Sequence, residues 1–185
     1  DTSSTTEITS KPSEPSEPSE PSEPVIQISD QQKEFIKMIT RFKSDYGKAS
    51  NELKKSTVRR KRRVAIEEFF GNDLLVQLVG EITRLSTTTQ QNAHVRISLL
   101  GTNIITVSTH RSELTDIGSD TLIQEDSWLY DTVSDFEEGD IVKFTGSFLT
   151  DESESSDYIE EISVSEDGSM TDPEFIFKFN SVEKI

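Results

Sequence analysis

The side chains of this sequence most able to bind a charged ligand form a cluster of cations in the first half of the chain. Guanidinium and ammonium groups bind phosphates and carboxylates through charge-assisted hydrogen bonds. Adjacent like charges cannot all lie on one face of a helix, so some of them should face solvent or an anionic partner. The cluster consists of Lys54, Lys55, Arg59, Arg60, Lys61, Arg62 and Arg63.

The distribution of charge leaves several partners open for these cations. Residues 30–73 contain twelve Lys/Arg and seven acids, whereas residues 74–185 contain six Lys/Arg and twenty-two acids. The cations can therefore lie against the acidic part of the same chain. They can also bind a protein partner, nucleic acid phosphates or, if an anchor lies upstream of Asp1, anionic lipid.

Residue types that support catalysis are few, and they do not form a known pattern. The chain has no cysteine and only two histidines, His94 and His110, which we expect at surface or half-buried positions of strands. It has no Gly-x-Ser-x-Gly segment, phosphate loop or set of metal-ligand histidines. The acids of 151–157 read as a solvated loop, with loose calcium binding as the alternative. We therefore expect no enzyme activity, no cofactor and no metal site.

The first 28 residues predict a disordered linker. They are rich in Pro, Ser and Glu, with a proline at every third position from 12 to 24. That spacing matches the three-residue turn of a polyproline II helix, and the repeated glutamates repel one another. A ligand for a Pro-binding domain is the alternative. Such a tether suits a domain outside the cytoplasm, and no residue pattern selects a compartment.

Residues 29–72 predict a long, basic, amphipathic helix. Ser29 and Asp30 form a suitable N-terminal cap. Apolar residues then follow at spacings of three and four, which gives a seam like that of a coiled coil, and we expect this stripe to pack on the following domain. The apolar positions are Phe35, Ile39, Phe42, Tyr46, Ala49, Leu53, Ile66, Phe69 and Phe70.

Residues 74–185 predict an acidic, mainly β domain. Apolar and polar residues alternate there with a period near two, in segments rich in β-branched and aromatic residues. A short helix at 127–136 is expected to cover one end of a barrel with Trp128, Leu129, Val133 and Phe136. The expected strands are 74–85, 93–100, 104–109, 141–149, 158–165 and 174–182.

This order of elements resembles the OB-fold, a small β-barrel also found in tRNA-anticodon-binding modules. Gly80 resembles the bend that lets a long first strand serve both halves of the barrel. The segment 138–146, Glu-Gly-Asp-Ile-Val-Lys-Phe-Thr-Gly, is similar to the fourth strand of many OB modules. The extra strand at 158–165 and the polar insertion at 113–126 depart from that pattern.

The resemblance implies a binding module, with two classes of ligand left open. The first expectation is a non-enzymatic module that recognises a protein or other ligand through its barrel or basic helix. The alternative is single-stranded nucleic acid, which OB modules bind by stacking bases on exposed aromatic rings. A net charge of −16 on residues 74–185 opposes that alternative. We also expect Phe175, Phe177 and Phe179, which alternate along one face, to point into the core.

Overall fold

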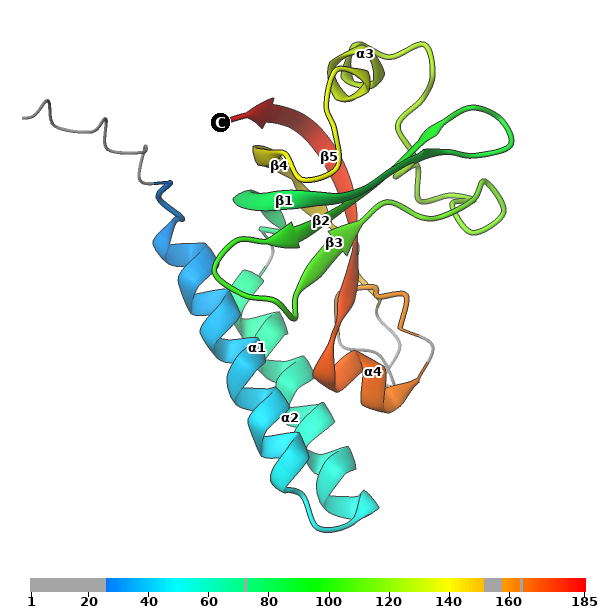
Figure 1. Ribbon diagram of the computed structural model, residues 1–185. Helices are drawn as coiled ribbons and strands as arrows, with labels where there is room; N and C mark the ends of the chain where they lie inside the picture. The colour runs from blue at the N-terminus through cyan, green and yellow to red at the C-terminus, as the bar shows by residue number, and fades with distance from the viewer. Residues whose placement is uncertain (1–25, 72, 152–157, 164) are drawn as a thin grey trace, which may run out of the picture.

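The chain forms a closed five-stranded β-barrel, with two helices packed side by side against one end (Figure 1). The computed structural model describes residues 26–71, 73–151, 158–163 and 165–185. The predicted linker therefore lies almost wholly outside the described residues. The barrel and the preceding helical segment confirm the expected fold class. The strands are β1 (Leu75–Thr87), β2 (Ala93–Leu99), β3 (Thr106–Ser108), β4 (Ile141–Phe148) and β5 (Glu174–Lys184).

The segment predicted as one long helix is in fact a helical hairpin of α1 (Asp30–Lys48) and α2 (Glu52–Phe70). A new helix begins after Asn51, because the Asn51 side chain caps α2 by accepting a hydrogen bond of 3.0 Å from the Lys54 N–H. The predicted apolar stripe holds as far as Tyr46, which is buried. Leu53 was predicted to belong to the same buried stripe, but its side chain is 82% exposed because the chain has already turned.

Two glycines in the barrel permit strands to approach more closely than any side chain would allow. β1 pairs with β4 through residues 75–81 and with β2 through residues 80–87, so Gly80 lies where both ladders meet. A Cβ atom on Gly80 would clash with the Ser98 carbonyl oxygen of β2. Gly146 on β4 is in the same position relative to the Lys178 carbonyl oxygen of β5. The long first strand therefore pairs with strands on both sides of the barrel, as expected, and Gly80 permits the close approach of β2.

The barrel closes through a parallel pairing of β3 with β5, while all its other pairs are antiparallel. The strand predicted at 158–165 is wrong. Ile159 and Glu161 form only isolated bridges, to Thr150 and Phe175. Backbone hydrogen bonds link this segment to Glu174 and Ile176 of β5 and to Leu149, just after β4, but they do not form a continuous ladder. The chain continues instead into a short helix that the sequence did not predict, α4 (Glu166–Thr171).

The helical hairpin joins the barrel through a cluster of aromatic rings. The centroid of the Phe35 ring of α1 lies 5.4 Å from that of Phe70 of α2, 5.7 Å from that of Phe148 of β4 and 5.8 Å from that of Phe175 of β5. Beside this cluster, the side chain of the buried Gln32 bonds to the Val79 backbone as a neighbouring strand would. Its Nε2 donates to the Val79 carbonyl at 2.8 Å, and its Oε1 accepts from the Val79 N–H at 2.8 Å. The predicted packing of the helical stripe on the β domain is confirmed.

The opposite end of the barrel is covered by α3 (Trp128–Ser134), within the segment predicted to be a short helix (Figure 1). Leu129 and Val133 are buried in the core, whereas Trp128 is 63% exposed. Phe175, Phe177 and Phe179 are all buried, as expected. No helix among the described residues combines the length and apolarity needed to cross a bilayer.

Replacing Gly80 by alanine should destabilise the barrel, because the new methyl group would meet the backbone of β2. We expect Gly80→Ala to lower the free energy of unfolding by about 2 kcal/mol or more, as overpacking does. Gly47→Ala is the matched control, because a methyl group on Gly47 in α1 would have no neighbouring atom within 4 Å. It should raise stability by about 0.5–1 kcal/mol. Urea unfolding followed by circular dichroism measures both, and equal effects would contradict the steric argument.

Candidate functional site

The predicted cationic cluster lies on α2, where its members point in different directions. Arg62 is fully buried and joins the hairpin to the barrel. Its Nη1 donates to the Ser169 carbonyl at 2.6 Å, and its Nη2 lies 3.7 Å from the Glu161 carboxylate. The guanidinium carbon also lies 5.8 Å from the centroid of the Phe175 ring. Arg62 therefore belongs to the core and is not available to a partner.

Two further cations of the cluster pair with acids within α4. Arg59 forms an ion pair with Glu166. Lys55 lies 3.6 Å from the Asp167 carboxylate, and the Tyr46 hydroxyl donates to the same carboxylate at 2.6 Å. Burial, followed by this bond to Asp167, raises the pKa of Tyr46 to about 12. These contacts support the view that part of the cluster neutralises the acidic domain of its own chain.

The other cations of the cluster lie nearer the surface. Lys54 and Lys61 are exposed, and Arg63 is half-buried. Exposed Arg60 and Lys61 line a groove between the two helices, which Asp45 and Glu68 also line. Acids of the same groove therefore oppose its positive charge. Arg41 lines the same groove, so three cations face two acids there. The anion-binding role of the cluster stays a prediction.

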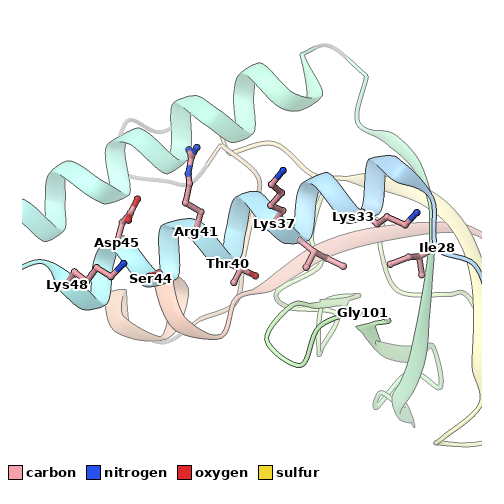
Figure 2. A pocket seen from close by; sticks show the side chains of 10 residues that line it. Ile28, Lys33, Lys37, Thr40, Arg41, Ser44, Asp45, Lys48 and Gly101 are labelled. Atoms are coloured by element: carbon pink, nitrogen blue, oxygen red, sulfur yellow. The ribbon is translucent and has the colours of Figure 1, made fainter.

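A second cationic groove runs along α1, next to the loop at Gly101 (Figure 2). Ile28 and Ile36 contribute apolar lining, and lysines and Arg41 contribute charge. Most of these cations already have a neighbour. Lys33 and Lys37 lie 2.9 Å and 3.7 Å from acids one turn away, and the Arg41 guanidinium lies over the Phe42 ring at 4.6 Å. Exposed pairs of this kind contribute little to stability.

A third concentration of positive charge lies on the barrel, where the sequence did not predict a site. Residues 74–185 contain three arginines, and all three line one pocket of about 450 Å³. We call it the arginine pocket. Its lining residues are Arg84, Ser86, His94, Arg96, Arg111 and Glu174.

A β-bulge creates this arrangement. Ile82 lies opposite Ile97 in the β1–β2 ladder, but Arg84 lies opposite Arg96, so the register shifts by one residue between them. Without that shift Arg84 would lie opposite Val95, whose side chain points into the core. The bulge thus turns Arg84 to the outer face, beside Arg96. Like charges directly opposite each other on paired strands destabilise a sheet, so this arrangement lowers the stability of the ladder.

One carboxylate compensates part of the positive charge of the pocket. Glu174 on β5 lies 2.9 Å from the Arg111 guanidinium and 3.3 Å from that of Arg96, and it accepts a hydrogen bond of 2.9 Å from Ser108. Arg84 forms no ion pair with any residue that the structure describes. Three guanidinium groups against one carboxylate leave a net charge near +2 in a domain that is otherwise strongly acidic. The pocket can hold a carboxylate or a phosphoryl group.

His94 forms the floor of the pocket and is buried, not surface or half-buried as the sequence suggested. Its Nδ1 lies 3.0 Å from the Thr109 hydroxyl and 3.1 Å from the His110 carbonyl oxygen. These contacts hold the ring in place and leave Nε2 as the nitrogen available to a ligand. His110 is buried as well, 3.3 Å from the Glu160 carboxylate.

No His/Cys/Asp/Glu group suited to a metal ion occurs among residues 26–71, 73–151, 158–163 and 165–185.

A comparison with protein-family models gives no match for this chain, and a search of curated proteins gives none either. The arrangement of residues in the pocket is therefore the basis for inferring function. Its chemistry is that of anion recognition.

Removing Arg62 should destabilise the protein far more than removing its neighbour Arg60. Loss of one partner from a buried ion pair typically costs about 3–5 kcal/mol, so we expect Arg62→Ala to lower the free energy of unfolding by about 3 kcal/mol or more. Arg60→Ala removes the same charge from an exposed position and should change stability by about 0.5 kcal/mol or less. Urea unfolding compares the two, and similar losses would show that Arg62 does not join the hairpin to the barrel.

The imidazole of His94 should titrate below its ordinary pKa of 6.5, mainly because burial penalises the charged ring. The bond to the His110 carbonyl and the charge of Glu174 oppose this shift, whereas Arg111 and Arg84 reinforce it. Because the unfolded chain binds this proton more readily, the contribution of His94 to stability is complete above about pH 6.5 and declines as the pH falls through the lower folded pKa.

An NMR titration of the imidazole signals tests this prediction. The His94 midpoint should lie below pH 6.5 and should move up toward it in Arg84→Gln. A midpoint at or above 6.5 in the unsubstituted protein would contradict the prediction.

Proposed function

We propose that this chain is a non-enzymatic binding module whose barrel recognises an anionic group of a protein partner. The observation that supports it is the arginine pocket. A domain with twenty-two acids places all three of its arginines around one open pocket. The side chains of Arg96 and Arg111 are 37% and 56% exposed, so a ligand can reach their guanidinium groups.

The position of the pocket fits a small barrel of OB type. The strand order β1-β2-β3-β5-β4, with a helix between β3 and β4, resembles the OB-fold. The extra strand predicted at 158–165 was one of two departures from the OB pattern, and the described residues of this segment do not form it. OB modules bind ligands on the face of their second and third strands. His94 and Arg96 lie on β2, and Ser108, which holds Glu174, lies on β3.

Binding without catalysis accounts for the roles of the groups in the pocket. Both oxygens of Glu174 already accept or face donors, from Ser108 on one side and from two guanidinium groups on the other. A general base needs an oxygen free to take a proton from substrate. The pocket thus supplies positive charge and shape, and its acid orients the arginines.

Single-stranded nucleic acid is the alternative ligand, favoured by the same arginines because guanidinium groups also bind phosphates. Two observations weigh against it. Four phenylalanine rings of β4 and β5 cannot stack with bases because they are buried in the core: Phe144, Phe148, Phe175 and Phe177 are each at most 2% exposed. The acidic domain around the pocket also repels a long polyanion. We therefore prefer a protein partner.

Capture of partners from cell extract on the immobilised full chain tests the proposal. Arg84→Gln with Arg111→Gln should abolish capture of proteins, because it removes two of the three positive charges while leaving the Arg96–Glu174 pair. Lys143→Gln with Lys178→Gln is the matched control: it removes the same charge from positions outside the pocket. Capture should survive in that control and after nuclease treatment. Salt-sensitive capture of nucleic acid alone would reject the proposal in favour of the alternative.

A further inference from the structure

His94 supplies the arginine pocket with a hydrogen-bond acceptor. The Thr109 hydroxyl donates to the His110 carbonyl at 3.1 Å, so both of these oxygens act as acceptors toward His94. The His94 Nδ1 lies 3.0 Å and 3.1 Å from the two oxygens and must therefore carry the ring proton. In the neutral imidazole, Nε2 is then the nitrogen with the lone pair. No residue that the structure describes donates a hydrogen bond to it.

The arginines of the pocket surround this acceptor with groups that only donate. Burial lowers the pKa of His94 below its ordinary value of 6.5, so the imidazole is neutral near pH 7. Arg96 and Arg111 lie 3.3 Å and 2.9 Å from the same Glu174 oxygen, which shows that these two guanidinium groups converge. Arg84 lies opposite Arg96 in the ladder. The pocket therefore combines converging donors with one lone pair.

A ligand that matches this pattern has negatively charged oxygens and one proton to donate. A phosphomonoester has both, because its second pKa is about 6 and it carries a charge of about −1.5 to −2 at pH 7. A carboxylate has only acceptors at this pH, since its ordinary pKa is about 4. A phosphodiester in a nucleic acid strand also has only acceptors, and it carries a single charge. The hydrogen-bonding pattern thus favours a phosphomonoester over both.

The charge and size of the pocket favour the same group. Three guanidinium groups and one carboxylate leave a charge near +2, which a phosphomonoester largely neutralises and a carboxylate only halves. The surrounding domain, with twenty-two acids against six Lys/Arg, disfavours ligands with many more negative charges. The volume of about 450 Å³ lies within the roughly 300–1,000 Å³ that is typical of ligand pockets.

Resting on the function proposed above, we infer that the arginine pocket binds a phosphomonoester carried by a side chain of the protein partner. The phosphoryl oxygens accept hydrogen bonds from Arg84, Arg96 and Arg111. One proton is shared between the phosphoryl group and the His94 Nε2. Clusters of arginines are a recurring means of binding phosphorylated side chains. Recognition by this module therefore depends on whether the partner is phosphorylated.

Fluorescence anisotropy at about pH 7 with labelled peptides and the full chain tests this inference. The probe is the peptide Gly-Ser-Gly-Ser-Gly-Ser-Gly with a phosphorylated central serine, a fluorescent label on its amino terminus and a carboxamide at its other end. We expect it to bind at least about tenfold more tightly than the same peptide with a central glutamate. A methyl phosphodiester on the central serine lacks the second charge and the proton, so it should also bind at least about tenfold more weakly.

Two matched comparisons locate the binding. Arg84→Gln should weaken the phosphoserine peptide at least about tenfold, whereas Lys178→Gln, which removes a charge from the barrel outside the pocket, should leave binding unchanged. In nitrogen NMR of the isotope-labelled chain, the Nε2 signal of His94 should move toward that of a protonated nitrogen when the peptide binds. The Nε2 signal of His110, which lies 3.3 Å from Glu160, is the control and should not move.

The outcomes separate this inference from the proposed function. Equal binding of the glutamate and phosphoserine peptides, still dependent on Arg84, would overturn the phosphomonoester assignment and leave anion recognition standing. Phosphoserine binding that is insensitive to Arg84 would overturn both. No binding by any peptide at millimolar concentration, or an unchanged His94 signal in the bound state, would overturn the inference. Adenosine monophosphate that binds at least about tenfold more tightly than the phosphoserine peptide would overturn the assignment to a protein side chain.

Discussion

The structure depends above all on the contact of Phe35 with the end of the barrel. A five-stranded barrel leaves apolar side chains open at its two ends, and burying them is worth about 1.5–3 kcal/mol for each large side chain. The Phe35 ring meets Phe148 and Phe175 of the barrel and Phe70 of the second helix, all within 6 Å between centroids. The helical hairpin is therefore part of the core and is not a separate basic domain.

The packing of the hairpin on the barrel determines which of its positive charges are buried and which acids they contact. Once the apolar stripe of α1 and α2 faces the barrel, Arg62 must lie at the same interface, and it is stabilised there by the Ser169 carbonyl and the Glu161 carboxylate. Arg59 then faces Glu166. The charge asymmetry that dominates the sequence is thus partly neutralised within the molecule.

The sequence predicted those parts of the structure in which local pattern and burial agree. In β4 every second residue is buried, as its alternation requires, and Gly80 lies where a bend was expected. Prediction failed where tertiary structure decides. The turn at Asn51 divides a stripe that continues through it in sequence. The residues at 158–163 alternate like a strand but form only isolated bridges, to Thr150 and Phe175. The arginine pocket has no sequence motif, because its three arginines are separated by twelve and fifteen positions.

The bulge between Ile82 and Arg84 connects the fold with the site. A regular β1–β2 ladder would turn Arg84 toward the core, where an unpaired guanidinium is very costly. The sequence could instead have kept a regular ladder with an apolar residue at this position. A register shift that directs one arginine against another places positive charge on the outer face of the β1–β2 ladder and lowers the stability of the sheet there. In a domain with twenty-two acids and six cations, the arginine pocket is therefore a local region of positive charge on an otherwise acidic domain.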